Sequence, residues 1–243
     1  MHNPYLLLWL EAPLQAWGHD SKFGRRDSLD FPTKSGVLGL IACAQGMNDA
    51  QTDWLAAWAD LDMQVAAYLL QDRQGYTLPR QPLLRDFHMA GAGYDLKDPW
   101  QALLEPRLSN GKPRTSPGGG AKMTYRYYLQ DMAFAVALQA PAQWAQEAAA
   151  ALQAPVWDLY LGRKNCVPTD FIYQGLFDSA EAALAQGVAL AQEKGRSWSF
   201  GVLQGEHAGE VITLNDVPLQ LGQHKRYRDR RVTVQHWRDE VQG

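Results

Sequence analysis

The sequence of 243 residues predicts an α+β fold with a ferredoxin-like core of the kind found in many RNA-binding domains, including RRM domains. Apolar runs at residues 5–10 and 63–70 predict strands, and a helical pattern at residues 34–45 lies between them. After a long polar excursion, the strand, helix and strand patterns follow again. This repeated order is the ferredoxin-like arrangement, and the excursion is an insertion into it.

The first half of the chain is predicted element by element. The run at residues 5–10 is continuously apolar, which is typical of a strand buried on both faces. A loop at residues 12–31 contains Arg25 and Arg26. The helix at residues 34–45 stops at Gly46, and a second helix at residues 51–59 carries tryptophans at helical spacing.

The excursion at residues 79–122 is rich in proline, glycine and basic residues. Loops of this length are uncommon in compact domains unless they have a function. Between residues 106 and 130 there is no acidic residue, and the cations are Arg107, Lys112, Arg114, Lys122 and Arg126. The segment is therefore either a solvated loop or a basic surface for a polyanion.

The second half resumes regular structure. Strand patterns occur at residues 123–138 and 156–161 around a helix at residues 142–152, followed by a helix at 179–194 and strands at 198–203, 209–214 and 231–237. We therefore divide the chain into a core (1–78 and 123–161), an insertion (79–122) and a smaller C-terminal β region (162–243).

Composition narrows the functional classes. A net charge of −3 argues against a protein that coats nucleic acid by bulk charge, so such a role must depend on local basic patches. Two cysteines are too few for a disulfide framework or a zinc site. We find neither a signal-peptide pattern nor a membrane-length apolar run, and we expect a soluble cytoplasmic protein that uses no membrane.

Lys34 and Ser35 stand at the predicted start of the first helix. Unpaired N–H groups and the helix dipole make such a start a potential phosphate site. The P-loop spacing is missing, however, because Pro32 and Thr33 precede Lys34. An ordinary helix capped by Thr33 or Ser35 and a nucleotide site are the alternatives.

Two further basic clusters could contact phosphates. Gly162 permits a tight turn, and Arg163 and Lys164 follow it directly. Residues 224–231 mix a histidine, five cations and a tyrosine with one aspartate. For both clusters, exposed cations on a solvated loop are the alternative.

Catalytic motifs are lacking. The sequence contains no H-E-x-x-H, C-x-x-C or G-x-S-x-G motif, and its six histidines have no ligand spacing. His88 or His224 could serve as a general base in metal-independent RNA cleavage. We expect no enzyme activity, no cofactor and no metal, with a metal-independent endoribonuclease as the alternative.

Four segments together resemble the CasD family of subunits of Cascade, the type I-E CRISPR surveillance complex. They are LLLWLEAPLQAWG at residues 6–18, the arginine loop leading into PTKSGVLGL at 32–40, the basic excursion, and YLGRKNCVP at 160–168. The resemblance covers essentially the whole chain. It implies a modified ferredoxin-like core in which the excursion is a protruding thumb.

The resemblance also implies a function in antiviral defence. Such a subunit is non-catalytic, binds the 5′ handle of the CRISPR RNA, and contacts the adjacent backbone subunit and the large PAM-reading subunit of a complex that binds target DNA. A related subunit of another subtype cleaves the repeat RNA itself. By motif, the handle phosphates would be held by Arg25, Arg26, Lys34, Ser35, Arg163 and Lys164. The thumb would add Arg107, Lys112, Arg114, Lys122 and Arg126.

Overall fold

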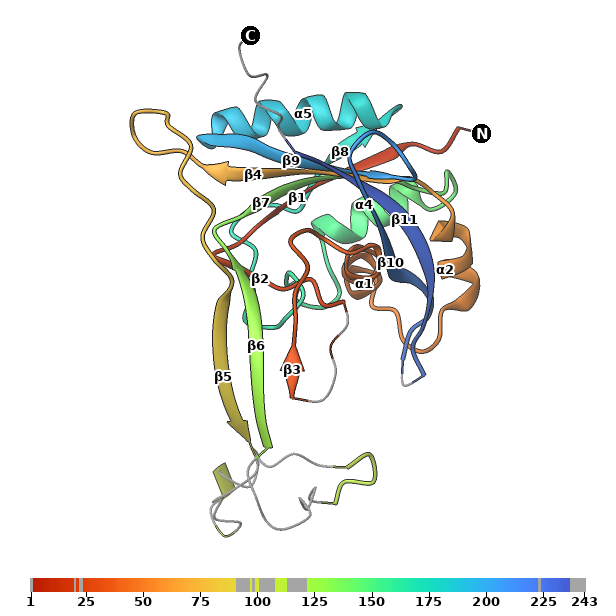
Figure 1. Ribbon diagram of the computed structural model, residues 1–243. Helices are drawn as coiled ribbons and strands as arrows, with labels where there is room; N and C mark the ends of the chain where they lie inside the picture. Colours follow the sequence, from red (N-terminus) through yellow and green to blue (C-terminus); the bar gives the residue numbers. More distant parts are fainter. Residues whose placement is uncertain are drawn as a thin grey trace.

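The computed structural model describes residues 2–19, 21, 24–90, 97, 99–100, 108–112, 122–222 and 224–236, without the side chains of residues 90 and 122. Its main feature is a seven-stranded sheet in which every neighbouring pair is antiparallel (Figure 1). From one edge to the other the strands are β10 (Glu210–Gln220), β11 (Arg226–His236), β9 (Arg196–Gln204), β4 (Met63–Leu70), β7 (Ala133–Gln139), β1 (Tyr5–Glu11) and β8 (Tyr173–Phe177). The predicted α+β class is confirmed.

Helices cover both faces of the sheet. On one face lie α1 (Lys34–Ala44), α2 (Thr52–Ala59) and α4 (Ala145–Gln153), whereas α5 (Ala180–Glu193) covers the other (Figure 1). The α1 and α2 helices match their predicted ranges closely, and α4 begins three residues later than expected.

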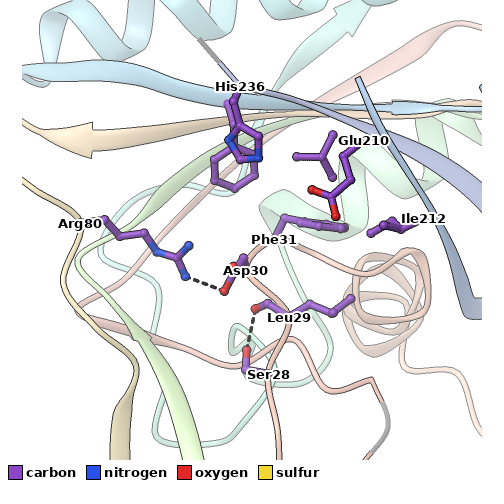
Figure 2. Close-up of a pocket in the computed structure, with 10 residues that line it drawn as sticks. Ser28, Leu29, Asp30, Phe31, Arg80, Glu210, Ile212 and His236 are labelled. Carbon is purple, nitrogen blue, oxygen red and sulfur yellow. Dashed lines mark hydrogen bonds and ion pairs between the residues drawn. The ribbon is translucent and has the colours of Figure 1, made fainter. Parts of the chain in front are cut away.

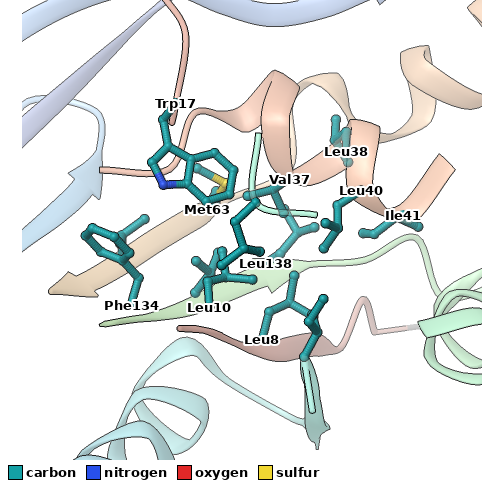
Figure 3. Close-up of a cluster of buried hydrophobic side chains, with 14 of the residues drawn as sticks. Leu8, Leu10, Trp17, Val37, Leu38, Leu40, Ile41, Met63, Phe134 and Leu138 are labelled. Atoms are coloured by element: carbon teal, nitrogen blue, oxygen red, sulfur yellow. The ribbon is translucent and has the colours of Figure 1, made fainter. Parts of the chain in front are cut away.

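The two-sided cover explains the continuous apolar run in β1. Leu8 and Leu10 belong to the core on the α1 side, in the same cluster as Val37 and Leu38 of that helix (Figure 3). Trp9 belongs to the smaller core on the α5 side. Successive strand side chains point to opposite faces, so a strand between two helical layers must be apolar at every position.

A smaller sheet projects from the main one. Its strands are β2 (Leu14–Gln15), β6 (Lys122–Gln130), β3 (Arg25–Arg26) and β5 (Leu84–Ala90). Figure 1 shows β5 and β6 as a long hairpin that extends away from the body of the molecule. The strand β5 lies inside the predicted excursion and pairs along its whole length with β6.

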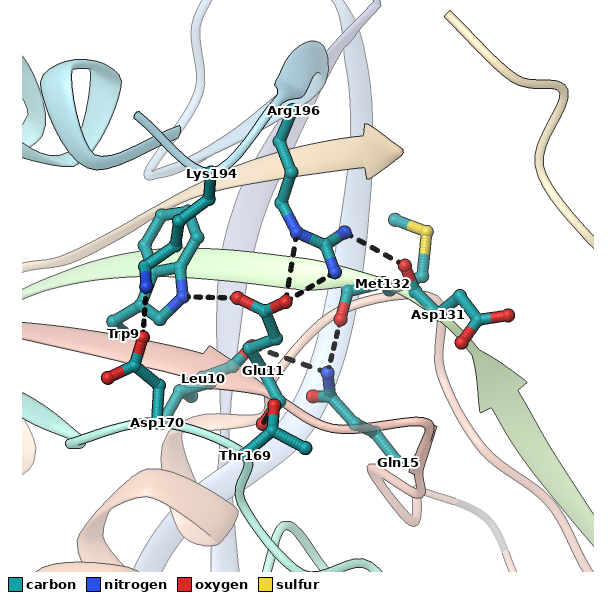
Figure 4. Close-up of polar contacts among 10 residues, drawn as sticks. All are labelled: Trp9, Leu10, Glu11, Gln15, Asp131, Met132, Thr169, Asp170, Lys194 and Arg196. Carbon is teal, nitrogen blue, oxygen red and sulfur yellow. Dashed lines mark hydrogen bonds and ion pairs between the residues drawn. The ribbon is translucent and has the colours of Figure 1, made fainter. Parts of the chain in front are cut away.

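Side chains tie the two sheets together where β1 runs into β2 and β6 runs into β7 (Figure 4). The Gln15 amide donates to the carbonyls of Leu10, at 3.3 Å, and Met132, at 2.7 Å. The Arg196 guanidinium pairs with the Glu11 carboxylate at 2.6 Å and donates to the Asp131 carbonyl at 2.9 Å. We call these residues the joint.

The structure contradicts the strand predicted at residues 156–161. Its backbone groups bond to other partners: the Val156 N–H donates to the carbonyl of Ala44 at the end of α1, and the Leu161 carbonyl accepts from Ala16. The edge position beside β1 belongs instead to β8. Val156 and Trp157 are exposed, whereas Leu161 is buried in the core. A short apolar pattern does not distinguish such a segment from a paired strand.

Candidate nucleic-acid interface

The parallel pairing of β3 with β6 presents Arg25 and Arg26 on the projecting sheet. Arg25 lies opposite Tyr125, and Arg26 opposite Arg126. The Gly24 carbonyl accepts a hydrogen bond of 2.7 Å from the Tyr125 N–H. A Cβ at Gly24 would lie 3.0 Å from the Met123 carbonyl oxygen, so the close approach of the strands favours glycine there.

Arg25 is accessible to a ligand. Its side chain is 66% exposed and bonds the Asp27 carboxylate at 2.7 Å. Its guanidinium carbon also lies 5.0 Å from the centroid of the Tyr127 ring, within cation–π range. The sequence placed Arg25 and Arg26 in a loop, whereas the structure places them on the short strand β3, with both side chains exposed.

Aromatic residues continue this surface along β5 and β6. Arg85 lies over the Tyr125 ring at 5.5 Å, and the Phe87 and Tyr125 ring centroids are 5.3 Å apart. Phe87 is 49% and Tyr125 43% exposed. We call Arg25, Arg85, Phe87, Tyr125 and Tyr127 the hairpin ladder. Rings and guanidinium groups in alternation suit unstacked bases and a phosphate backbone.

Sequence reasoning found only part of the hairpin ladder. It identified Tyr125 and Tyr127 as strand residues, but not their partners Arg85 and Phe87. Residues 123–138 were predicted as strand from the sequence, whereas the register that sets Phe87 opposite Tyr125 and Arg85 opposite Tyr127 depends on pairing across the insertion.

Arg163 holds the interface together from behind. Its guanidinium donates to the carbonyl of Tyr127 on β6 at 2.9 Å and to that of Arg26 on β3 at 2.8 Å. It also lies 4.5 Å from the centroid of the buried Tyr128 ring. Arg163 is therefore a positioning residue for the two strands, whereas its neighbour Lys164 is exposed.

The structure contradicts the prediction that Lys34 presents a cation to a phosphate. Lys34 is 0% exposed, and its ammonium donates to the carbonyls of Ala59, at 2.9 Å, and Leu61, at 2.5 Å. Burial, aided by the Arg230 cation, lowers the pKa of Lys34 to about 8, although nearby carboxylates oppose the shift. This side chain joins α1 to the end of α2.

The start of α1 is occupied by protein groups. The Thr33 hydroxyl accepts from the Gly36 N–H at 3.1 Å, and the Asp216 carboxylate accepts from the Lys34 N–H at 2.7 Å. Arg230 in turn pairs with Asp216 at 2.7 Å. The structure therefore supports the capped-helix alternative. It argues against a nucleotide site, because the Lys34 ammonium and the N–H groups at the start of α1 are bonded to protein groups.

A groove nevertheless runs along the glycine face of α1. A cavity of about 230 Å³ is lined by Ser35, Gly39 and Gly162, and it shares Cys43 and Tyr160 with a neighbouring cavity of about 580 Å³. The second cavity is also lined by Lys164. Ser35 also lines a third cavity of about 420 Å³. Ser35 and Lys164 thus line one chain of cavities, which we call the α1 groove.

The predicted thumb cations are only partly described. Arg126 is half-buried on β6, and Lys112 is exposed. Arg107 and Arg114, together with the Lys122 side chain, lie outside the described residues. In the C-terminal basic cluster, carboxylates pair with Arg228, Arg230 and Arg231, so much of its charge is compensated within the protein.

The described residues show few features of a nuclease, a metal-binding protein or a membrane protein. His88 lies 2.5 Å from the Asp86 carboxylate, while His224 lies in a bend just before β11. In the described ranges, no three His, Cys, Asp or Glu side chains gather in a way that could hold a metal ion. None of the helices in the described part of the chain has the length and apolar character needed to cross a bilayer.

Comparisons with known proteins identify a family model and a relative that match most of the chain. Residues 5–238 match the family model described as CRISPR-associated protein (Cas5). The chain is 30% identical over 225 residues to the CRISPR system Cascade subunit CasD of Escherichia coli (strain K12), covering 88% of each protein.

Two solved structures are also similar. A chain of a CRISPR RNA-guided surveillance complex aligns with a TM-score of 0.67 and 29% identity, over 95% of this chain and 88% of that one. A crystal structure of a Cas protein aligns with a TM-score of 0.58 and 26% identity, over 96% and 94% of the two chains. Because the family model spans nearly the whole sequence, the chain belongs to the Cas5 family of CRISPR-associated proteins.

Proposed function

We propose that this protein is a non-catalytic, RNA-binding subunit of a CRISPR RNA-guided surveillance complex and that it binds the 5′ handle of the CRISPR RNA. The observation that carries the proposal is the juxtaposition of Arg25 and Arg26 with the exposed rings of the hairpin ladder. The relatives named for Cascade and for a surveillance complex support it. Phosphate contacts would supply affinity, and splayed bases would supply identity.

The RNA would follow the exposed cations. Arg25 and Arg26 would hold phosphates, and the RNA would continue along the α1 groove past Ser35 to Lys164. Arg126 and Lys112 remain proposed contacts of the thumb, as do the cations outside the described residues. Lys34 is no longer among the proposed contacts, because its ammonium is enclosed by protein.

We also propose how the architecture serves this role. The antiparallel order β8–β1–β7–β4 fits a ferredoxin-like core, with β8 as its fourth strand. The β5–β6 hairpin would be the stem of the thumb that reaches the adjacent backbone subunit. The large PAM-reading subunit would dock nearby, in a cytoplasmic complex that binds target DNA.

A charge-removal experiment tests RNA binding. Each phosphate contact to a single strand contributes about 0.7 to the slope of log affinity against log salt concentration. Arg25→Ala with Arg26→Ala should therefore weaken retention of guide RNA and reduce the slope by about 1.4. Arg73→Ala with Arg231→Ala is the control, because it removes the same charge from exposed sites away from the hairpin ladder. Equal slopes for the two double variants would overturn the proposal.

A second experiment separates binding from cleavage. Purified protein incubated with labelled CRISPR repeat RNA in EDTA should leave the RNA intact. A discrete cut that disappears in His88→Ala would favour the endoribonuclease alternative. Replacing residues 82–118 with a short linker should preserve the fold of the body and impair assembly with the other subunits.

A further inference from the structure

A second pocket, separate from the α1 groove, opens beneath β9, β10 and β11. Its volume is about 300 Å³, at the lower end of the range for small-ligand sites. Residues 28–31, just before α1, form one wall, and the other is formed by the middle of β9, the start of β10 and the end of β11 (Figure 2). We call it the strand-end pocket.

Aromatic rings form the inner surface of the strand-end pocket. Phe31 and Phe200 are each only 4% exposed, and their ring centroids are 6.4 Å apart in an edge-to-face arrangement. The His236 ring lies 5.7 Å from Phe200. Figure 2 shows His236 and Phe31 on adjoining sides of the same space. A flat, aromatic ligand would find ring faces or edges on two sides.

Charged groups stand at the rim. Arg80, from the segment that leads into the thumb, bonds the Asp30 carboxylate at 2.5 Å. Glu210 begins β10, and within the described part of the chain its carboxylate has no hydrogen-bond or ion-pair partner. Its position is set by Gly209, whose φ of +141° and 2.5 Å approach of a Cβ to the Val234 carbonyl would strain any other residue.

These features select the kind of ligand. Arg80 compensates the Asp30 carboxylate, so Glu210 is the unpaired charge at the rim, and its carboxylate repels a phosphate group of a nucleic-acid backbone. Carboxylates do accept hydrogen bonds from the amino groups of bases, and aromatic side chains stack on bases that have left the strand. An aliphatic side chain from a partner protein would fit this pocket less well than a base, because it offers no hydrogen-bond donor to the Glu210 carboxylate.

We propose that the strand-end pocket receives one unstacked nucleobase of the bound RNA, and that Glu210 selects a base carrying an exocyclic amino group. Uracil is disfavoured because it presents carbonyl oxygens on both sides of its single ring N–H. The inference rests on the proposed function, since it takes its ligand from the same RNA.

The pocket lies within reach of the proposed phosphate contacts. Asp30 follows Arg26 by four residues, a span of at most about 14 Å in extended chain. The bridge between Trp17 and Leu29 fixes the intervening segment against the body of the protein. An RNA whose phosphate is held by Arg26 could therefore place one base in the pocket while the RNA backbone stays outside.

The test uses the RNA that copurifies with the full-length chain in its complex. After sequencing, that RNA is resynthesised as a series in which one amino-bearing base at a time is replaced by its deaminated counterpart, which has a carbonyl at the same position. One replacement should weaken binding to the wild-type protein by about tenfold. In Glu210→Gln this difference should vanish, because an amide both donates and accepts.

Matched variants complete the design. Glu147→Gln removes the same charge from an exposed site on α4 and should retain the wild-type discrimination. His236→Ala should weaken binding of the intact RNA, and His236→Phe should restore it by replacing the ring. Wild-type discrimination in Glu210→Gln, or wild-type affinity in His236→Ala, would overturn the base pocket while leaving the proposed function in place. If the wild-type complex retains no RNA, both proposals fail.

Discussion

The Asp216 carboxylate, on β10, accepts a 2.7 Å hydrogen bond from the backbone N–H of Lys34, at the first residue of α1. A protein anion thus occupies the helix end that the sequence offered to a phosphate. The same carboxylate pairs with Arg230 on β11. The first helix is consequently fixed to the C-terminal hairpin by a buried ionic contact.

Asp216→Asn should be strongly destabilising. Asp216 is 2% and Arg230 7% exposed, so the variant leaves a buried guanidinium without its anion. We expect the free energy of unfolding in urea to fall by about 3–5 kcal/mol. Glu206→Gln, which removes the anion of the exposed Arg231 pair, should cost less than about 1 kcal/mol. Similar losses in both variants would contradict this view of the contact.

Lys34 should make stability rise with pH in the alkaline range. Its pKa falls from 10.5 in the unfolded chain to about 8 in the folded protein, so between these values the unfolded chain binds more protons. Relative to Lys34→Met, the wild-type free energy of unfolding should increase by on the order of 3 kcal/mol from pH 8 to pH 10.5. Parallel pH profiles of the two proteins would exclude a depressed pKa.

Two glycines should respond in opposite ways to alanine. Gly39 is inside α1 with open space at its Cβ position, so Gly39→Ala should stabilise the protein by about 0.5–1 kcal/mol. Gly162 has φ +94°, and its Cβ would lie 1.7 Å from the Ala16 carbonyl oxygen. Gly162→Ala should cost at least about 1–3 kcal/mol. Thermal unfolding measures both, and a neutral Gly162→Ala would show that the turn can relax.

Arg163→Lys should loosen β3 selectively. Arg163 reaches the carbonyls of Tyr127 and Arg26 with two different nitrogens of a planar guanidinium, a geometry that the single nitrogen of a shorter lysine side chain does not reproduce. Hydrogen exchange at the Tyr125 amide, which bonds Gly24 on the β3 side, should accelerate by at least about tenfold. Lys164→Ala, at the exposed neighbour, should leave that rate unchanged. An unaltered Tyr125 rate in Arg163→Lys would mean that β3 is held by other contacts.

Local patterns predicted much of the core. The apolar run in β1 and the spacing of α1 and α5 depend on neighbours within one element, so burial follows from the residues themselves. The segment at 156–161 has the same apolar character but forms no strand. Its partners are Ala44 and Ala16, far away in sequence, and no local rule reveals them.

The parts of the candidate site that consist of neighbouring residues were predictable from the sequence, whereas the parts formed by contacts between distant segments were not. Arg25 and Arg26 were identified from the sequence as neighbouring cations before the first helix, and the structure shows both side chains exposed. Lys34 looked equivalent, but its environment comes from α2 and from Asp216, which lies 182 residues along the chain. The fork of Arg163 likewise joins strands that the sequence does not show to be neighbours.

The joint has a mechanical consequence for the projecting hairpin. Two connections between the sheets meet there, β1 to β2 and β6 to β7. The Arg196 guanidinium, 4% exposed, contacts both, because it bonds Glu11 on the first and Asp131 on the second. Gln15 repeats this double attachment with Leu10 and Met132. Movement of β5 and β6 as a free arm would break the hydrogen bonds that Arg196 and Gln15 donate to the carbonyls of Asp131 and Met132, so the direction of the hairpin is set within the subunit itself. A load applied along the hairpin would pass into the main sheet through β7, which is paired on both sides, with β4 and with β1.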